Sequence, residues 1–142
     1  MSDTEPTVET VMSRKIYTVS EQDPLRDAYE LMMDQGIRAL PVLGSNDSPV
    51  GMICDRDILC YRMQNILPRH ADYYINVSEV MTSEVRTLSP ETVLKKACDK
   101  LTESGYLQIP VLNENQEVVG LFGYDDLLCF FLENGENIFE MN

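Results

Sequence analysis

The chain has 142 residues, 44% of them hydrophobic and 25% charged, which is the composition of a globular protein rather than a disordered one. Eleven lysines and arginines stand against 24 aspartates and glutamates, and the net charge of −13 argues against general binding of DNA or RNA. No apolar run reaches the ~18 residues of a membrane span, and the polar, acidic N-terminus is unlike a signal peptide. We therefore expect a cytoplasmic protein with no nucleic-acid and no membrane partner.

Residues suited to catalysis or metal binding are few. The four cysteines, Cys54, Cys60, Cys98 and Cys129, form no Cys-x-x-Cys pair, and His70 is the one histidine. This spacing matches neither a zinc site nor a redox motif, so we expect no metal and interpret the cysteines as buried structural residues. The sequence contains no nucleophile elbow, dinucleotide-binding loop or Walker loop, and we expect no enzymatic activity.

The chain repeats itself at an offset of 69 residues. Between Val8 and Met63, 17 of 56 positions are identical to the residue 69 places later, where chance would give roughly 3 or 4. The matches include Gly36 with Gly105 and Asp57 with Asp126. Because glycine and aspartate positions set backbone geometry, we infer two copies of one supersecondary unit.

Each copy predicts the order strand, helix, strand, strand, helix. A capping side chain followed by Pro24 or Pro90 at the first helical position predicts each first helix, and Gly36 or Gly105 predicts its end in the left-handed conformation. The eight methionines have core spacing, which favours gap filling over a soft metal site. The other expected elements are strands Ile16–Val19 and Val85–Leu88, strands Ala39–Leu43 and Gln108–Leu112, strands Val50–Cys54 and Val118–Phe122, and helices Ile58–Asn65 and Leu127–Glu133.

The predicted fold class is α+β (α/β), with two β-α-β-β-α repeats related by pseudo-two-fold symmetry. A copy of about 60 residues buries its apolar face poorly alone, so we expect the copies to pack sheet to sheet, with helices outside and one shared core. The expected segments are an N-terminal tail at 1–7, a first repeat at 8–65, a connector at 66–76, a second repeat at 77–133 and a C-terminal tail at 134–142.

Three motifs recur in the same order in both copies. The first copy has VM at 11–12 with TVS at 18–20, then GIRALPV at 36–42 and GMICDRD at 51–57. The second copy has VMT at 80–82 with TLS at 87–89, then GYLQIPV at 105–111 and GLFGYDD at 120–126. With these motifs the chain resembles the CBS domain family from residue 8 to residue 132. The resemblance implies a tandem pair, or Bateman module, with no fused enzyme or channel.

The resemblance implies a regulatory sensor that binds AMP, ADP, ATP or S-adenosylmethionine in clefts between the repeats, with no required cofactor. The family's ligand motif is Gly-h-h-Thr/Ser-x-x-Asp, where h is hydrophobic, the Asp holds ribose hydroxyls and the Thr/Ser touches phosphate. Asp57 and Asp126 match the ribose position. The Thr/Ser position departs from the pattern, because it is Cys54 in the first copy and Gly123 in the second.

The resemblance also implies further ligand contacts, mainly from backbone in the Gly-to-Pro segments and from a wall formed by the first strands. The matching residues of the Gly-to-Pro segments are Ile37, Arg38, Leu40, Tyr106, Leu107 and Ile109. The matching residues of the wall are Ser13, Ile16, Thr18, Thr82, Val85 and Thr87.

Two interpretations of Asp57 and Asp126 stay open. Each stands just before an apolar helix, where a carboxylate can cap the helix and contribute about 1 kcal/mol. A carboxylate also accepts two hydrogen bonds from a vicinal diol, and one side chain can do both.

Charge distinguishes the two copies. The basic residues near the first copy's motifs are Arg14, Lys15, Arg38 and Arg56, and their counterparts are Ser83, Glu84, Leu107 and Asp125. We therefore predict that a ligand phosphate lies nearest the first copy's basic residues. The alternative is that these cations are solvated or paired with carboxylates at the surface.

Residues 127–132 (LLCFFL) are apolar on every face of a helix, and such a helix must be covered. One account is burial within the chain. The other, which we favour, is a homodimer contact through Leu127, Leu128, Phe130 and Phe131.

Three functions remain. The first, which we favour, is a sensor that binds an adenosine ligand and changes its affinity for a partner. The second is a ligand-free interaction or dimerisation module with degenerate clefts. The third is a regulatory subunit whose regulated protein is a separate chain.

Overall fold

The chain divides into two structural units. The computed structural model describes residues 5–68 and 70–134, so the expected tail residues 1–4 and 135–142 lie outside it. Tyr17–Val85 make one unit, which we call the inner unit after its place along the chain. The outer unit joins the segment up to Ile16 to the chain from Arg86 onward.

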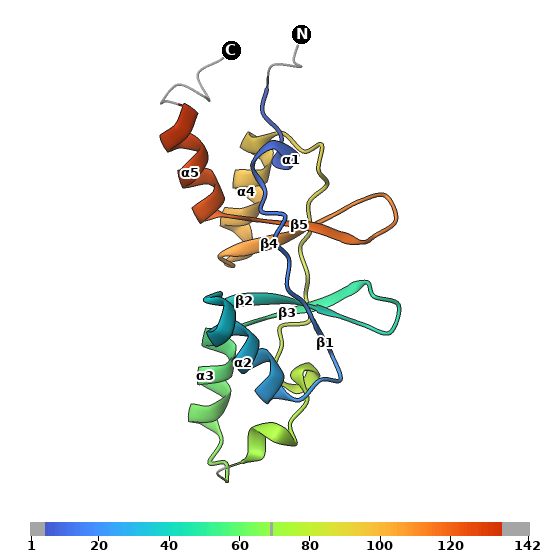
Figure 1. The fold of residues 1–142 in the computed structure, drawn as a ribbon, viewed down its shortest axis with the longest axis vertical. Helices are drawn as coiled ribbons and strands as arrows, with labels where there is room; N and C mark the ends of the chain where they lie inside the picture. Colours follow the sequence, from blue (N-terminus) through green and yellow to red (C-terminus); the bar gives the residue numbers. More distant parts are fainter. Residues whose placement is uncertain (1–4, 69, 135–142) are drawn as a thin grey trace. The chain divides into compact units, whose positions relative to one another are not determined.

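The inner unit is a three-stranded sheet with two helices on one face (Figure 1). Strand β1 (Val19–Ser20) pairs parallel with β2 (Ala39–Leu43), which pairs antiparallel with β3 (Pro49–Cys54). The helices are α2 (Leu25–Gln35) and α3 (Asp55–Gln64). Two short 3₁₀ turns follow, η2 (Ala71–Tyr73) and η3 (Val77–Glu79).

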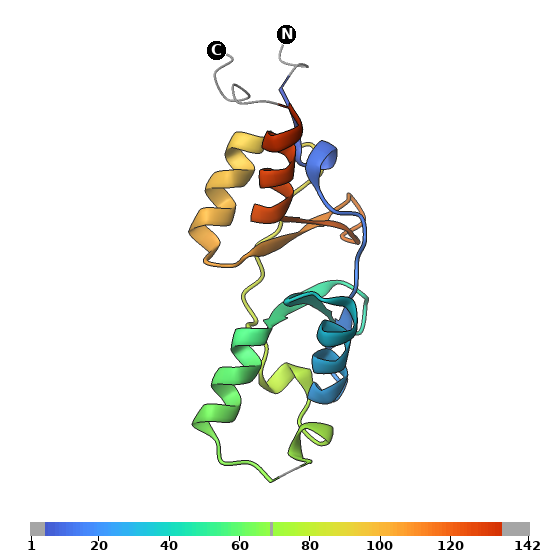
Figure 2. The same cartoon turned by 60° about the vertical axis from the view of Figure 1, so that its left-hand side comes forward.

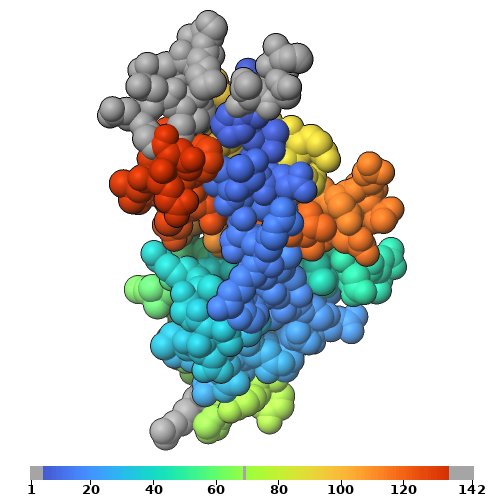
Figure 3. Space-filling model, turned by 45° about the horizontal axis from the view of Figure 1, so that its top comes forward, coloured from blue at the N-terminus to red at the C-terminus, as the bar shows by residue number. Residues whose placement is uncertain are grey.

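The outer unit has a two-stranded sheet, and α4 and α5 lie side by side on one face of it (Figures 1 and 2). Its elements are α1 (Val8–Val11), α4 (Leu94–Ser104), β4 (Gln108–Leu112), β5 (Val118–Gly123) and α5 (Tyr124–Asn134). In the space-filling view the blue α1 lies between the red α5 and the orange hairpin of β4 and β5 (Figure 3).

The two repeats exchange their first segments. The N–H of Val8 donates to Thr92 O at 2.8 Å in the outer unit, and the N–H of Val77, 69 residues later, donates to Asp23 O at 2.8 Å in the inner unit. Val8 and Val77 are both fully buried. Each repeat therefore supplies a hydrophobic anchor to the unit that contains the strands and helices of the other.

The expected shared core is wrong, because each unit has a core of its own. The outer core gathers Val8 with the α4 stripe and Phe122, and the inner core gathers Val77 with the α2 stripe and Ile53. The exchanged segment adds apolar surface to the core of each unit.

The predicted strands β2 and β4 and the left-handed glycine caps are confirmed. Gly36 has φ 65° and Gly105 has φ 77°, values that favour glycine. The predicted strand Ile16–Val19 shortens to β1, and Val85–Leu88 reduces to a single bridge between Leu88 and Val111.

The predicted helix starts are corrected. Pro24 is the N-cap of α2 rather than its first residue, and α4 starts at Leu94 rather than next to Pro90. Ser89 and Thr92 instead hydrogen-bond each other at 3.0 Å in a turn before α4. The helices predicted from Ile58 and Leu127 start three residues earlier, at Asp55 and Tyr124.

Burial corrects two interpretations of single residue types. Cys54 and Cys98 are half-buried, but Cys60 and Cys129 are exposed and so are not buried structural residues. Met12, Met32 and Met52 fill cores as expected, whereas Met33 and Met63 are exposed.

The connector packs against the inner unit. Arg26 of α2 forms ion pairs with Glu30 at 3.0 Å and with Asp72 of η2 at 3.5 Å, and its guanidinium lies 5.5 Å from the ring centre of Tyr73. Ile75 is buried in the inner core. Over the residues described, the longest apolar helices fall short of what a membrane crossing requires.

The segment exchange predicts which fragments fold. We expect residues 17–85, the inner unit, to unfold cooperatively in denaturant, because Ile75 and Val77 complete its core. We expect residues 8–65, the first sequence repeat, to show no cooperative transition, because that fragment lacks Ile75 and Val77. Circular dichroism during urea titration measures the difference, and equal stability of the two fragments would contradict the exchange.

Candidate functional site

The 17 residues expected to contact ligand fall into two sets, one in each unit. The inner unit contains Thr18, Ile37, Arg38, Leu40, Cys54, Arg56, Asp57, Thr82 and Val85. The outer unit contains Ser13, Ile16, Thr87, Tyr106, Leu107, Ile109, Gly123 and Asp126.

The exchange decides which wall residue lies beside which motif. Thr82 pairs with Met52 of β3 through two backbone hydrogen bonds of 2.8 and 2.9 Å. Ser13 pairs in the same way with Leu121 of β5, at 2.8 and 2.9 Å. Each glycine-to-aspartate motif is therefore flanked by the wall segment of the other repeat.

Asp57 caps α3 from inside its first turn. Cys54 is the N-cap residue, and its N–H donates to Asp57 Oδ2 at 2.9 Å. The Cys54 thiol donates to the same oxygen at 3.2 Å. Asp57 thus caps α3 from its third position, and the expectation that it precedes the helix is wrong. Among the described residues no partner contacts Asp57 Oδ1, so this oxygen can accept hydrogen bonds from a ligand.

Asp126 repeats this geometry at the start of α5. Its Oδ2 accepts the N–H of Gly123 at 2.8 Å, and no described residue occupies Oδ1. Burial raises the pKa of the Asp126 carboxyl, and the neighbouring Asp125 charge raises it further, whereas the Gly123 hydrogen bond opposes the shift. A second negative group is therefore unfavourable at this position.

Cys54 and Gly123, which occupy the family's Thr/Ser position, differ in the space around them. Burial raises the pKa of the Cys54 thiol, so the thiol is a neutral, weak donor. A Cβ placed on Gly123 would lie 2.7 Å from the backbone oxygen of Leu107 and 2.7 Å from Gln108 Cγ. The close approach of β4 therefore leaves no room for a side chain at Gly123.

The four cations expected near the first copy's motifs divide between the two units. Arg14 and Lys15 follow Ser13 and belong to the outer unit, with Arg14 3.8 Å from Glu9. Arg38 and Arg56 remain in the inner unit, and both are exposed. Arg38 Nε lies 2.8 Å from Asp55 Oδ2, an exposed pair that contributes little to stability and can open to a ligand.

Two expected contacts cannot involve side chains. Leu40 and Ile109 are fully buried in the two cores, so only their backbone could approach a ligand. The six wall residues are half-buried and accessible.

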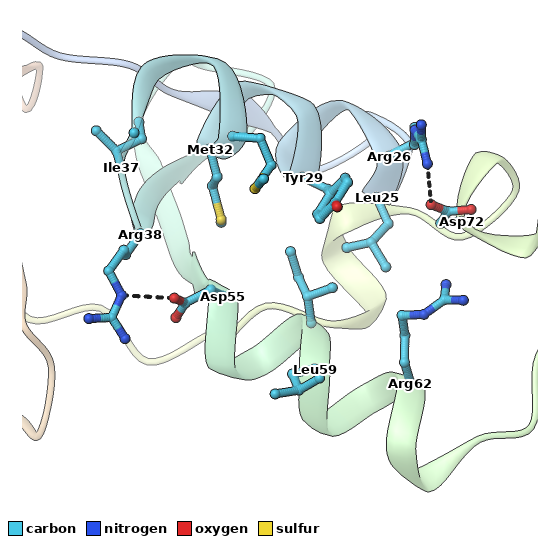
Figure 4. A pocket seen from close by; sticks show the side chains of 13 residues that line it. Leu25, Arg26, Tyr29, Met32, Ile37, Arg38, Asp55, Leu59, Arg62 and Asp72 are labelled. Atoms are coloured by element: carbon cyan, nitrogen blue, oxygen red, sulfur yellow. Dashed lines mark hydrogen bonds and ion pairs between the residues drawn. The ribbon is translucent and has the colours of Figure 1, made fainter.

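A pocket between α2 and α3, missed by the sequence analysis, lies wholly in the inner unit and has a volume of about 760 Å³ (Figure 4). Leu25, Met32 and Ile58 form its apolar floor, and Arg38 and Arg62 stand at its rim. Met33 and Leu59, which also line it, are exposed. The helical stripe that suggested core packing for Met33 was the available signal, but a stripe does not separate a core from an open groove.

Comparison with known proteins gives one family. The model of the CBS domain matches residues 8–63 and 77–133. A homoserine O-acetyltransferase from Methanosalsum zhilinae is 28% identical over 121 residues, which are 85% of this chain and 23% of that protein. The corresponding enzyme from Methanosphaerula palustris is 29% identical, again over 23% of its length. The chain thus spans a small part of these curated relatives.

Two solved structures share the fold. CBSX2 in complex with AMP, a protein of Arabidopsis thaliana, is 22% identical with a TM-score of 0.75, covering 90% of this chain and 97% of that one. The CBS domain pair of protein MJ0100 in complex with 5′-methylthioadenosine and S-adenosyl-L-methionine is also 22% identical. Its TM-score is 0.76, over 88% of this chain and 98% of that one.

The different space around Cys54 and Gly123 predicts that a serine changes the stability of the protein differently at these two positions. We expect Gly123→Ser to lower the free energy of unfolding by about 1–3 kcal/mol, because its Cβ would meet the Leu107 backbone. The matched control is Cys54→Ser, for which we expect less than about 1 kcal/mol, since a side chain already fits there. Urea denaturation measures both, and equal costs would contradict the packing argument.

Proposed function

Because the chain belongs to the CBS domain family, we propose that it is a regulatory module that binds an adenosine-containing ligand. Ligand binding then changes the affinity of the module for a partner protein. The ligand classes are AMP, ADP, ATP and S-adenosylmethionine. Support comes from the ligands held by the two structural relatives. Further support comes from the geometry of the glycine-to-aspartate motifs at 51–57 and 120–126 and the residues beside them, which we call the motif edges.

The proposal depends mainly on Asp57, whose two carboxylate oxygens differ in their contacts. One carboxylate oxygen caps α3, and the other has no partner among the described residues. A vicinal diol offers two O–H donors, and a carboxylate fixed in position by its cap accepts them without losing further side-chain freedom. Asp126 has the same arrangement in the outer unit.

Charge and space favour the inner unit for a phosphorylated ligand. Arg38 and Arg56 lie at its motif edge, and Thr82 lies alongside through its pairing with β3. In the outer unit Leu107 and Asp125 occupy the positions of these arginines, and Gly123 offers no side chain. A phosphate would meet Asp125 and Asp126 there, so we place it at the inner unit.

The chain has no catalytic role in this proposal. The matched family and the solved relatives are CBS domain pairs, which regulate rather than catalyse. The homoserine O-acetyltransferases contain the matching segment in 23% of their length. We propose that this chain, likewise, responds to a ligand and leaves any reaction to a different part or a separate partner.

Self-association is part of the proposal. Leu127 packs in the outer core, and Phe130 and Phe131 pack against it, so burial within the chain accounts for these three. Leu128 remains exposed, as does Leu132 one turn later. Two exposed leucines on one helix favour contact with a second copy.

A ligand-free interaction module is the second candidate, and Gly123 favours it. With no hydroxyl there and a thiol at Cys54, neither motif edge offers the phosphate contact of the family pattern. Binding measurements separate the two candidates.

We expect one of AMP, ATP, adenosine or S-adenosylmethionine to stabilise the protein in a thermal-shift panel, by about 2.7 kcal/mol at 100 times its dissociation constant.

We expect Asp57→Asn, which keeps an acceptor for the α3 cap, to lower the affinity for that ligand about tenfold. The reason is that a neutral amide accepts hydrogen bonds from the diol less strongly than a carboxylate, and calorimetry measures the change. Asp126→Asn is the matched control. If none of the four compounds binds, the ligand-binding proposal is wrong and the ligand-free interaction module is the remaining candidate.

The arginine side chains should act on the phosphate alone. We expect Arg38→Ala and Arg56→Ala each to lower the affinity for ATP and AMP about tenfold and to leave the affinity for adenosine unchanged. The reason is that only the phosphates carry negative charge that these arginines can bind. Unchanged ATP and AMP affinity in both variants, measured by calorimetric titration, would show that these cations only solvate the surface.

A further inference from the structure

We infer that the pocket between α2 and α3 of the inner unit binds a medium-chain fatty acid, a ligand with one unbranched hydrocarbon chain and one terminal carboxylate. This site is additional to the proposed adenosine site and does not depend on it. Its lining contains neither Asp57 nor Thr82, and it shares only Ile37 and Arg38 with the expected adenosine contacts. Its volume of about 760 Å³ lies in the range of known small-molecule sites.

The floor of the pocket is apolar. Leu25, Met32 and Ile58 form it, and all three are buried. Met33 and Leu59 stand beside the floor with 66% and 60% of their surface exposed. A hydrocarbon chain on this floor would remove apolar side chains from water, which is favourable, and the unbranched methionines can adapt to its shape.

The floor favours a hydrocarbon chain over a peptide. A peptide has a backbone C=O, and nearly always an N–H, at every residue, and each of these groups needs a partner. No side chain of the floor is polar, so none could supply one. Along α3 the lining extends from Asp55 to Arg62, a rise of about 10 Å, which a medium-chain fatty acid can span with its carboxylate at one end.

The rim of the pocket has a positive charge left over. Arg38 Nε lies 2.8 Å from Asp55 Oδ2 at one end, and Arg26 pairs with Asp72 at 3.5 Å at the other (Figure 4). Arg62 stands at this second end too, and no residue that the structure describes forms an ion pair with it. Three arginines and two aspartates leave a charge of +1 in a chain that carries −13, so the rim favours an anion.

Arg62 suits a carboxylate because a guanidinium can donate two parallel N–H bonds to its two oxygens. An ion pair at so exposed a position is weak by itself. The hydrocarbon chain therefore supplies most of the affinity, and Arg62 selects the head group. A ligand with the chain but no charge should bind less tightly, and a carboxylate with a very short chain should not bind.

Calorimetric titration of the full chain with decanoate, decanol and butyrate tests both parts of the ligand. We expect decanoate to bind at one site per chain, decanol to bind about tenfold more weakly, and butyrate to give no binding heat. We expect Arg62→Ala to lower the affinity for decanoate to that for decanol, and to leave the affinity for decanol unchanged.

Two exposed methionines provide a matched pair of variants that locates the site. Met33 lines the pocket and Met63 does not, and they are 66% and 78% exposed, so a glutamate at either position leaves the core intact. We expect Met33→Glu to lower the affinity for decanoate about tenfold or more, because it brings a carboxylate beside the ligand. We expect Met63→Glu to leave that affinity unchanged.

Equal affinities for decanoate and decanol, or equal losses in the two methionine variants, would overturn the inference. Absence of decanoate binding would overturn it too, and is the result expected if a second copy or a peptide covers the pocket instead. AMP titrated into Met33→Glu tests the proposed function separately, because Met33 lies outside the motif edges.

Discussion

The structure depends on one constraint: neither unit is complete without a short segment from the other repeat. Val8 and Val77 are the anchors of these segments, and both are fully buried. The same segments carry Ser13 and Thr82, whose backbones pair with β5 and β3. Core formation and the placing of the wall residues are therefore one event, because the burial of an anchor fixes the residues that follow it beside a motif.

The motif aspartates show how stability and binding share one side chain. Each carboxylate holds a helix start with one oxygen and leaves the other without a described partner. A surface carboxylate would lose side-chain freedom on meeting a ligand, whereas these are already fixed by their caps. The interpretations as cap and as ligand contact are thus compatible, and the geometry supplies the reason.

Part of this was predictable from the sequence and part was not. Strands β2 and β4 and the caps at Gly36 and Gly105 follow from local chemistry and are confirmed. The exchange was not predictable, because repeats that match at 69 residues offer the same partners to either segment, and only chain connectivity separates them. The lack of space at Gly123 was not predictable, because the sequence shows that the side chain is missing but not that the backbone of Leu107 lies close to it.

The exchange also has a consequence for synthesis on the ribosome. The inner unit is continuous in sequence, so it can assemble as soon as Val85 has emerged. The segment around Val8 is made first, yet its partner Thr92 emerges more than eighty residues later. Until then this apolar segment has no native partner, and the similar segment that begins at Val77 can compete for the same kind of surface. The order of translation, which completes one unit before the rest of the other exists, favours the native exchange over a mismatched one.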